Sequence, residues 1–171
     1  MIDPMDILNA RESRAYLQEK VIKKFNLPLL IIRANYPGTD KNNKTTKYIV
    51  KNIFDTILLR VLPIHIEKID SFEGPIFLLS IDTSPIKLKN MAIDIEINHP
   101  LGRLVDLDIL DLNNHTLSRT ELGYPPRTCF ICFDLAHNCV RSRKHSLEEL
   151  FKHIETIVSD FKKDGEKCIT T

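Results

Sequence analysis

The chain has 171 residues, of which 43% are hydrophobic and 27% charged, and its formal net charge is +1. This length suits one domain that buries roughly 70% of its unfolded surface, and the near-zero charge gives no field that would attract nucleic acid or an anionic membrane. No apolar run approaches the roughly 20 residues that span a bilayer, and the N-terminus carries acids where a signal peptide carries lysines. We therefore expect a soluble, cytoplasmic protein without nucleic-acid or membrane partners.

The N-terminal part predicts a helix and then a buried strand. Asn9 and Glu12 form a capping-box pattern, and the apolar residues that follow lie on one helical face, which predicts a helix to about Asn26. Residues 29–32 are a continuous apolar run of strand length, which is typical of a strand covered on both faces.

A polar loop over residues 39–47 precedes the clearest element, a core helix. Apolar residues keep a spacing of three and four over residues 49–61, with a proline just past the end. Residues 64–69 and 76–81 then predict a hairpin-like pair of strands. The first of these loses its alternation at Lys68, which indicates a bulge or a sheet edge.

The second half of the chain predicts two helices and a strand between them. Ser84, followed by proline, marks an N-cap, and an apolar stripe predicts a third helix up to about His99. Residues 104–110 predict a strand. A capping box that begins at Ser146 predicts a last amphipathic helix, which we expect to end near Gly165.

The middle of the chain thus has the order strand, helix, strand, strand, helix, strand. This is the order of a split β-α-β, or ferredoxin-like, sheet. We expect an α+β fold in which such a sheet is flanked by the N- and C-terminal helices. Residues 1–171 would form a single domain with a Cys/His knuckle insertion at 124–145.

An acidic pair lies on the strand over residues 104–110. Asp106 and Asp108 point to the same side of a strand, with α-carbons roughly 7 Å apart, so both carboxylates can reach one divalent ion or a pair of ions. The same spacing also fits an ordinary amphipathic strand with solvated acids. Gly102 and Arg103 just before the strand, and leucines beside the acids, favour a partly covered metal site.

Three cysteines within eleven residues form a second cluster, and they fit metal ligation in a reducing compartment better than a disulfide framework. The spacings between Cys129, Cys132, Cys139 and His145 suit a zinc-knuckle-like loop with tetrahedral ligation. Such a zinc would be structural because the protein would fill all four positions. The alternative is a set of reduced cysteines packed among apolar neighbours.

Arginines surround both clusters. Guanidinium groups bind phosphate bidentately, so phosphate chemistry is the first hypothesis. The arginines of this stretch are Arg103, Arg119, Arg127, Arg141 and Arg143.

Several motifs together closely resemble one family, the holo-acyl-carrier-protein synthases of citrate lyase, also called apo-citrate lyase phosphoribosyl-dephospho-CoA transferases. They are His99-Pro100-Leu101-Gly102-Arg103, Asp106-x-Asp108, Leu117-Ser118-Arg119, Pro125-Pro126-Arg127-x-Cys129-x-x-Cys132, Cys139-x-Arg141 and His145-Ser146-Leu147. The resemblance extends upstream to Arg11-Glu12-x-Arg14 and Pro37-Gly38-x-x-Lys41, and so covers nearly the whole chain.

The resemblance implies that the whole chain is one transferase domain of nucleotidyltransferase type. Its donor would be triphosphoribosyl-dephospho-CoA, and its acceptor a serine of the apo acyl-carrier (gamma) subunit of citrate lyase. The phosphoribosyl-dephospho-CoA prosthetic group would be transferred and diphosphate released. The zinc assignment is not part of the resemblance and rests on the cysteine spacing alone.

The resemblance and the chemistry together assign the site residues. Asp106 and Asp108 are expected to hold Mg²⁺, with Arg103 beside them as a catalytic group. The expected substrate-binding residues are Gly102, Arg119, Arg127, Arg141, Arg11, Arg14 and Lys41. The general base stays open between one carboxylate of the pair, Asp111 and His99.

A non-catalytic function is the alternative. In it, a zinc-knuckle module binds RNA or a protein tail through the arginines near the cysteines, and no bond is made. The near-zero net charge argues against this alternative.

Overall fold

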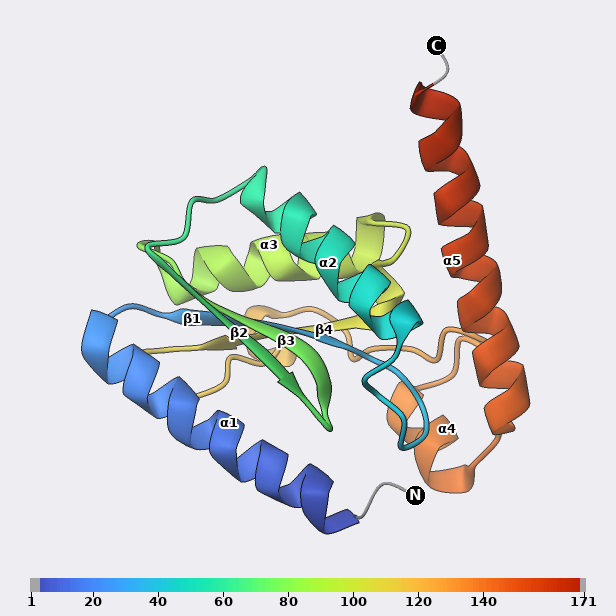
Figure 1. Cartoon of the computed structure of the whole chain (residues 1–171), viewed down its shortest axis with the longest axis horizontal. Helices are drawn as coiled ribbons and strands as arrows, with labels where there is room; N and C mark the ends of the chain where they lie inside the picture. Colours follow the sequence, from blue (N-terminus) through green and yellow to red (C-terminus); the bar gives the residue numbers. More distant parts are fainter. Residues whose placement is uncertain (1–3, 170–171) are drawn as a thin grey trace. The chain divides into compact units, whose positions relative to one another are not determined.

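The computed structural model describes residues 4–169, and side chains are described for residues 5–164 (Figure 1). The chain divides into two compact units, a first unit Met1–Ser118 and a second unit Arg119–Thr171. Each is described by itself. The sequence-based expectation of a single domain stays a prediction. In the described part of the chain, no helix has the length and apolar character needed to cross a membrane.

The first unit is built on a four-stranded antiparallel sheet, which confirms the predicted α+β class. Its strands are β1 (Leu29–Ala34), β2 (His65–Ser71), β3 (Gly74–Ser80) and β4 (Val105–Leu110). Their order across the sheet is β2-β3-β1-β4, so β2 and β4 are the edge strands. The pairing of β2 with β3 is continuous from His65 to Ser71. The lost alternation at Lys68 therefore reflects an edge and not a bulge.

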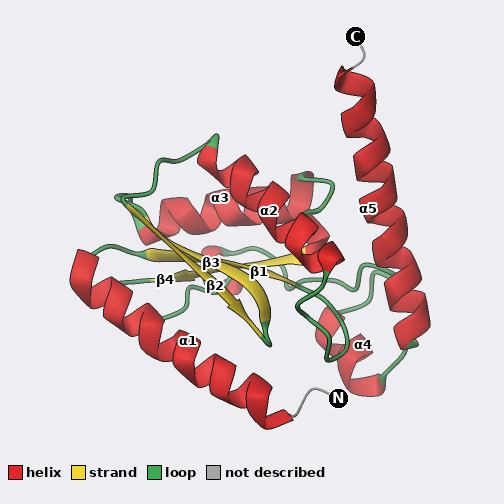
Figure 2. Ribbon diagram, in the orientation of Figure 1, coloured by secondary structure: helices red, strands yellow, loops and turns green. Residues whose placement is uncertain are grey.

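Helices cover both faces of this sheet (Figure 2). The helix α1 (Pro4–Phe25) packs on one face, where Val21 and Ile22 join a core with residues of β1, β3 and β4. The helices α2 (Lys44–Leu58) and α3 (Pro85–Asn98) lie on the other face, and a short 3-10 helix, η1 (Gly102–Leu104), leads from α3 into β4.

Local capping explains where these helices begin. Asn43 accepts a hydrogen bond from the Thr46 backbone N–H (2.9 Å), and the Thr46 hydroxyl accepts one from Asn43 N–H (3.2 Å), which is a reciprocal capping box. Ser84 caps α3 through the Lys87 N–H at 3.2 Å, as predicted. The predicted start of α1 at Asn9 is wrong, because the helix already begins at Pro4, a residue suited to a first helical turn.

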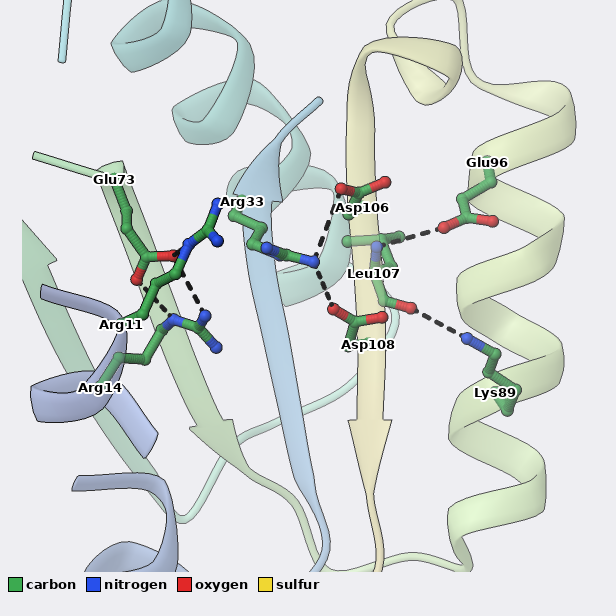
Figure 3. A network of polar contacts seen from close by, with 9 residues as sticks. All are labelled: Arg11, Arg14, Arg33, Glu73, Lys89, Glu96, Asp106, Leu107 and Asp108. Atoms are coloured by element: carbon green, nitrogen blue, oxygen red, sulfur yellow. Dashed lines mark hydrogen bonds and ion pairs between the residues drawn. The ribbon is translucent and has the colours of Figure 1, made fainter. Parts of the chain in front are cut away.

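The outer edge of β4 is bonded by side chains of α3. Glu96 Oε1 accepts a hydrogen bond from Leu107 N–H at 3.1 Å, and Lys89 Nζ donates to the Leu107 carbonyl at 3.1 Å. Both side chains are buried, with 6% of Lys89 and 4% of Glu96 exposed. Backbone groups at a sheet edge need partners when they are covered. These two side chains supply the partners. They hold β4 at Leu107, the residue between Asp106 and Asp108 (Figure 3).

The second unit contains the 3-10 helix η2 (Thr120–Leu122) and the helices α4 (Ala136–Ser142) and α5 (Leu147–Ile169). The predicted capping box opens α5: Ser146 N–H donates to Glu149 at 2.8 Å, and Glu149 N–H donates to Ser146 Oγ at 3.1 Å. The expected end near Gly165 is wrong, because α5 continues to Ile169.

Replacing Lys89 with alanine tests whether this side chain secures β4. The Leu107 carbonyl would lose a buried donor, so we expect a loss of about 1–3 kcal/mol in the free energy of unfolding, measured by urea denaturation. Lys87→Ala is the matched control on the same helix. Its side chain is exposed, and the change should stay within about 0.5 kcal/mol. Equal losses in the two variants would contradict this role of Lys89.

Candidate active site

The acidic pair lies on the α1 face of β4. Asp106 and Asp108 point to this face, while Val105, Leu107 and Ile109 point to the helices α2 and α3 and are at most 1% exposed. Antiparallel pairing sets Ile31 opposite Asp108 and Arg33 opposite Asp106.

Arg33 is the immediate partner of both carboxylates (Figure 3). Its Nη2 donates to Asp108 Oδ2 at 3.1 Å and lies 3.7 Å from Asp106 Oδ2. All three side chains are about one-third exposed, at 30 to 32%. The pair therefore carries negative charge at a partly covered position, where a cation already balances it.

A small pocket opens beside Asp106. Three cationic side chains and two carboxylates contribute to its lining: Arg11, Arg33, Lys41, Glu73 and Asp106. Its volume is about 60 Å³, whereas pockets that enclose a whole drug-sized ligand occupy about 300–1,000 Å³. It can therefore hold one small charged group, such as a phosphate or a metal ion, and not a whole nucleotide.

Glu73 organises the arginines of α1. Its carboxylate accepts hydrogen bonds from Arg14 Nε at 2.7 Å and Nη2 at 3.1 Å, and it lies 3.5 Å from Arg11 Nε. Only 6% of the Glu73 side chain is exposed, against 57% for Arg11. Arg14 is thus engaged by Glu73, whereas Arg11 lines the pocket and reaches solvent.

Lys41 reaches the pocket because its loop is fixed by two contacts. The Lys41 carbonyl accepts a hydrogen bond from Thr46 Oγ1 at 2.8 Å. It also packs so closely on Gly74, which has φ 93°, that a Cβ there would overlap it. Burial, with added repulsion from Arg11 and Arg33, lowers the pKa of Lys41, while neighbouring carboxylates oppose this shift.

Gly102 and Arg103 lead into the acidic strand from η1. Gly102 is buried, and a Cβ there would overlap the backbone carbonyl of Ile95 in the last turn of α3. Its requirement for glycine thus has a packing reason. Arg103 is half-buried, immediately before Leu104 and β4.

His99 belongs to the helical layer and not to the face of the acidic pair. Its Nδ1 accepts a hydrogen bond from Leu101 N–H at 3.0 Å, and its Nε2 lies 3.3 Å from Thr56 Oγ1 on α2. Burial lowers the pKa of His99, with a smaller effect from Arg60. The structure therefore favours its role at the end of α3 over that of a general base.

Asp111, the other candidate base outside the pair, stabilises a turn. Its Oδ1 accepts hydrogen bonds from the N–H groups of Asn113 and His115, both at 2.8 Å. This is the usual role of an aspartate that begins a turn.

The second unit brings the predicted zinc ligands together. One ligand atom from each of Cys129, Cys132, Cys139 and His145 lies within 4.8 Å of the others. Cys132 Sγ is 3.4 Å from Cys139 Sγ and 3.2 Å from His145 Nε2. The donor set is that of a structural Cys₃His metal site, and the predicted cluster is confirmed as a possible metal site.

The loop around these cysteines is closed by short-range contacts. Cys129 N–H donates to the Asp134 carbonyl at 2.6 Å, and Ile131 N–H donates to Cys129 Sγ at 3.4 Å. Without metal, a hydrogen bond from the Asp134 backbone and one from His145 lower the pKa of Cys132 to about 6. Burial raises the pKa of Cys139 to about 12. Thiolates this close together repel one another, and a bound cation would relieve that repulsion.

The remaining predicted arginines lie in the second unit. Arg119 precedes η2, and Arg141 lies on α4. Arg127 accepts, through its carbonyl, a hydrogen bond from Ala136 N–H at 3.0 Å. Their roles in substrate binding stay predictions.

Sequence reasoning missed Arg33 and Glu73. Arg33 directly follows the apolar run that marked β1, and nothing in that run indicates which face of the sheet its side chain takes. Glu73 precedes the turn glycine Gly74, where no periodicity indicates a buried side chain. By contrast, the predicted residues Arg11 and Lys41 meet Asp106 at the pocket, although they are far apart in sequence.

The sequence is similar to members of one known family. The sequence model of the family described as CitX, apo-citrate lyase phosphoribosyl-dephospho-CoA transferase, matches residues 3–161. A Streptococcus pyogenes protein named "Probable apo-citrate lyase phosphoribosyl-dephospho-CoA transferase" is 35% identical over 94% of this chain and 88% of its own length. The Escherichia coli protein of that name, without "probable", is 32% identical over 91% of this chain and 87% of its own length.

A longer relative matches as well. "Protein CitXG" of Haemophilus influenzae is 30% identical over 90% of this chain, and the match spans only 34% of the relative's length. This chain therefore corresponds to about one third of that protein.

Proposed function

Because the chain belongs to the family of apo-citrate lyase phosphoribosyl-dephospho-CoA transferases, we propose that it modifies the apo acyl-carrier subunit of citrate lyase. The donor is triphosphoribosyl-dephospho-CoA and the acceptor is a serine hydroxyl. The observation that carries this proposal is the carboxylate pair beside a small pocket lined by three cationic side chains.

The reaction is a phosphoryl-type transfer of nucleotidyltransferase kind. The serine oxygen forms a bond to the phosphorus next to the ribose. The bond from that phosphorus to the oxygen it shares with the second phosphorus breaks, and diphosphate leaves. Negative charge spreads over the non-bridging and leaving oxygens, so positive groups aimed at these atoms lower the barrier.

The carboxylate pair fits a magnesium site. Two same-face carboxylates, each about one-third exposed, offer the oxygen ligands that Mg²⁺ prefers. Bound there, Mg²⁺ would supply a Lewis acid for the phosphate oxygens. Arg11, Arg33 and Lys41 would bind and orient the diphosphate part of the donor. Arg103, Arg119, Arg127, Arg141 and Arg14 remain proposed as further substrate-binding or catalytic residues, and Gly102 as part of the same motif.

The acceptor proton needs a base near the transferred phosphorus. With His99 bonded to α2 and Asp111 bonded to its own turn, we assign this role to one carboxylate of the pair Asp106 and Asp108.

We also infer a ferredoxin-like sheet. The strand order β2-β3-β1-β4 supports it, because β1 and β2 are joined through α2 yet separated by β3, and β3 and β4 are joined through α3 yet separated by β1.

Neutralising either carboxylate tests the proposed site. Asp106→Asn and Asp108→Asn should each lower transfer to the carrier by at least about a hundredfold, because the metal and phosphate site loses its charge. Stability should change by less than about 1 kcal/mol, since the ion pairs with Arg33 are partly exposed. The readout is the mass gained by the carrier subunit over time, with thermal melting as the check of folding.

Asp55→Asn is the matched control, because Asp55 is an exposed acid paired with Lys51 on α2. This variant should transfer at the wild-type rate. Wild-type activity in both the Asp106 and Asp108 variants would show that the pair is not the site of transfer.

We further propose that the Cys₃His cluster holds structural zinc. Protein purified without chelator should then contain about one zinc per chain by metal analysis. Removal of the zinc should raise hydrogen exchange over residues 124–145 more than in the sheet, because ligation orders this loop.

Cys132→Ser should lose the zinc, whereas Cys168→Ser, at a cysteine outside the predicted ligand set, should retain it. Zinc-free protein with freely titratable cysteines, purified under the same conditions, would refute the assignment.

The arginines of the second unit have their own test. Arg127→Lys and Arg141→Lys keep the charge but lose bidentate phosphate binding, so kcat/KM should fall about tenfold or more. Arg60→Lys is the control, because Arg60 pairs with Asp94 on the exposed surface of the first unit. Steady-state kinetics with equal, negligible effects in all three variants would remove Arg127 and Arg141 from the site.

A further inference from the structure

We propose that Arg33 exchanges partners during the catalytic cycle. In the metal-free protein it neutralises Asp106 and Asp108, and when a divalent cation binds these carboxylates it turns to the phosphate oxygens of the donor in the adjacent pocket. Arg33 thereby couples metal binding to phosphate binding. This inference rests on the proposed function and adds a residue that neither the motifs nor the family resemblance had assigned.

The first observation is that one guanidinium serves both carboxylates. Arg33 Nη2 lies 3.1 Å from Asp108 Oδ2 and 3.7 Å from Asp106 Oδ2 (Figure 3). A divalent cation on this face would bind the same two carboxylates. Arg33 and a divalent cation therefore compete for the same negative charge.

The second observation is that this pairing leaves Arg33 incompletely satisfied. Its Nε atom is buried and has no hydrogen-bond partner among the described residues. A buried donor without a partner is costly, and such cases call for a physical explanation. An arrangement in which the guanidinium leaves the carboxylates and meets phosphate oxygens would give this donor an acceptor.

The third observation is the composition of the pocket. Arg33 lines it together with Arg11 and Lys41, and Asp106 and Glu73 contribute the opposing charge. Glu73 is already held by Arg14 through two hydrogen bonds. Once a divalent cation compensates Asp106, the pocket carries an excess of positive charge, which suits one phosphate group of the donor.

The coupling has a definite thermodynamic form. Arg33 opposes the metal while no phosphate is present, and it supports phosphate once the metal is bound. Replacing it should therefore move the two affinities in opposite directions. A residue that only keeps the strands in place would lower both affinities.

The test uses Mn²⁺ and inorganic diphosphate as probes, with the full chain and no carrier subunit. Mn²⁺ binding is followed by electron paramagnetic resonance of the free ion, and diphosphate binding by calorimetry at saturating Mg²⁺. Arg33→Met should bind Mn²⁺ about two- to fivefold more tightly than wild type, the range expected for removal of a partly exposed competing ion pair. It should bind diphosphate about tenfold more weakly, as expected for the loss of a charge-assisted contact.

Three further variants test the interpretation. Arg33→Gln should show the same opposite shifts, and it keeps a polar side chain if the methionine variant folds poorly. The double variant Asp106→Asn/Asp108→Asn should lose Mn²⁺ binding. This loss would show that the Mn²⁺ measured in the wild type is bound by the acidic pair. Arg60→Met, at the exposed pair with Asp94, should leave both affinities unchanged.

The outcomes separate this inference from the proposed function. If wild type binds Mn²⁺ through the acidic pair but the Arg33 variants bind it equally or more weakly, the exchange of partners is overturned and the metal site stands. Unchanged diphosphate affinity in the Arg33 variants also overturns it. If wild type binds no Mn²⁺, both the inference and the proposed metal site fail. Neither result depends on whether the carrier subunit is the acceptor.

Discussion

The antiparallel pairing of β1 with β4 is the constraint on which the candidate site depends. Its register sets Arg33 opposite Asp106, and the two-residue repeat of a strand brings Asp108 to the same face. A shift of one residue would turn the carboxylates into the core beneath α2 and α3. Since Leu30, Ile32, Leu107 and other core residues must stay buried, the same hydrophobic pattern that forms the sheet also fixes the charged cluster.

Elements remote from the carboxylates hold this arrangement from both sides. On the outer edge of β4, Lys89 and Glu96 bond the two backbone groups of Leu107, so the edge strand cannot shift freely. On the α1 face, Glu73 forms ion pairs with Arg11 and Arg14 of the first helix. The close approach of Lys41 to Gly74 brings a loop to the same pocket. Charged residues from separate segments of the chain are thus brought to one small pocket.

Whether a site residue could be predicted from the sequence depends on whether it belongs to a local sequence pattern. Asp106 and Asp108 interrupt an apolar strand, and the spacing of the cysteines is a local pattern, so both clusters were predicted. Arg33 lies at the end of an apolar run whose two faces cannot be told apart by periodicity, and its role comes from pairing with a strand about 70 residues away. Glu73 is buried only through tertiary contacts. The early start of α1 at Pro4 was missed because the pattern at Asn9 equally resembles a cap.

The central claim is that this chain joins a donor phosphate to a carrier serine and releases the remaining two phosphates. The most direct measurement follows one reaction of the purified protein with Mg²⁺, triphosphoribosyl-dephospho-CoA and the apo carrier subunit, by intact mass and phosphorus NMR together. The account predicts that the carrier gains the mass of one phosphoribosyl-dephospho-CoA group on a serine while one equivalent of diphosphate forms. Binding of the carrier without any gain in mass would contradict it and would favour the non-catalytic binding module.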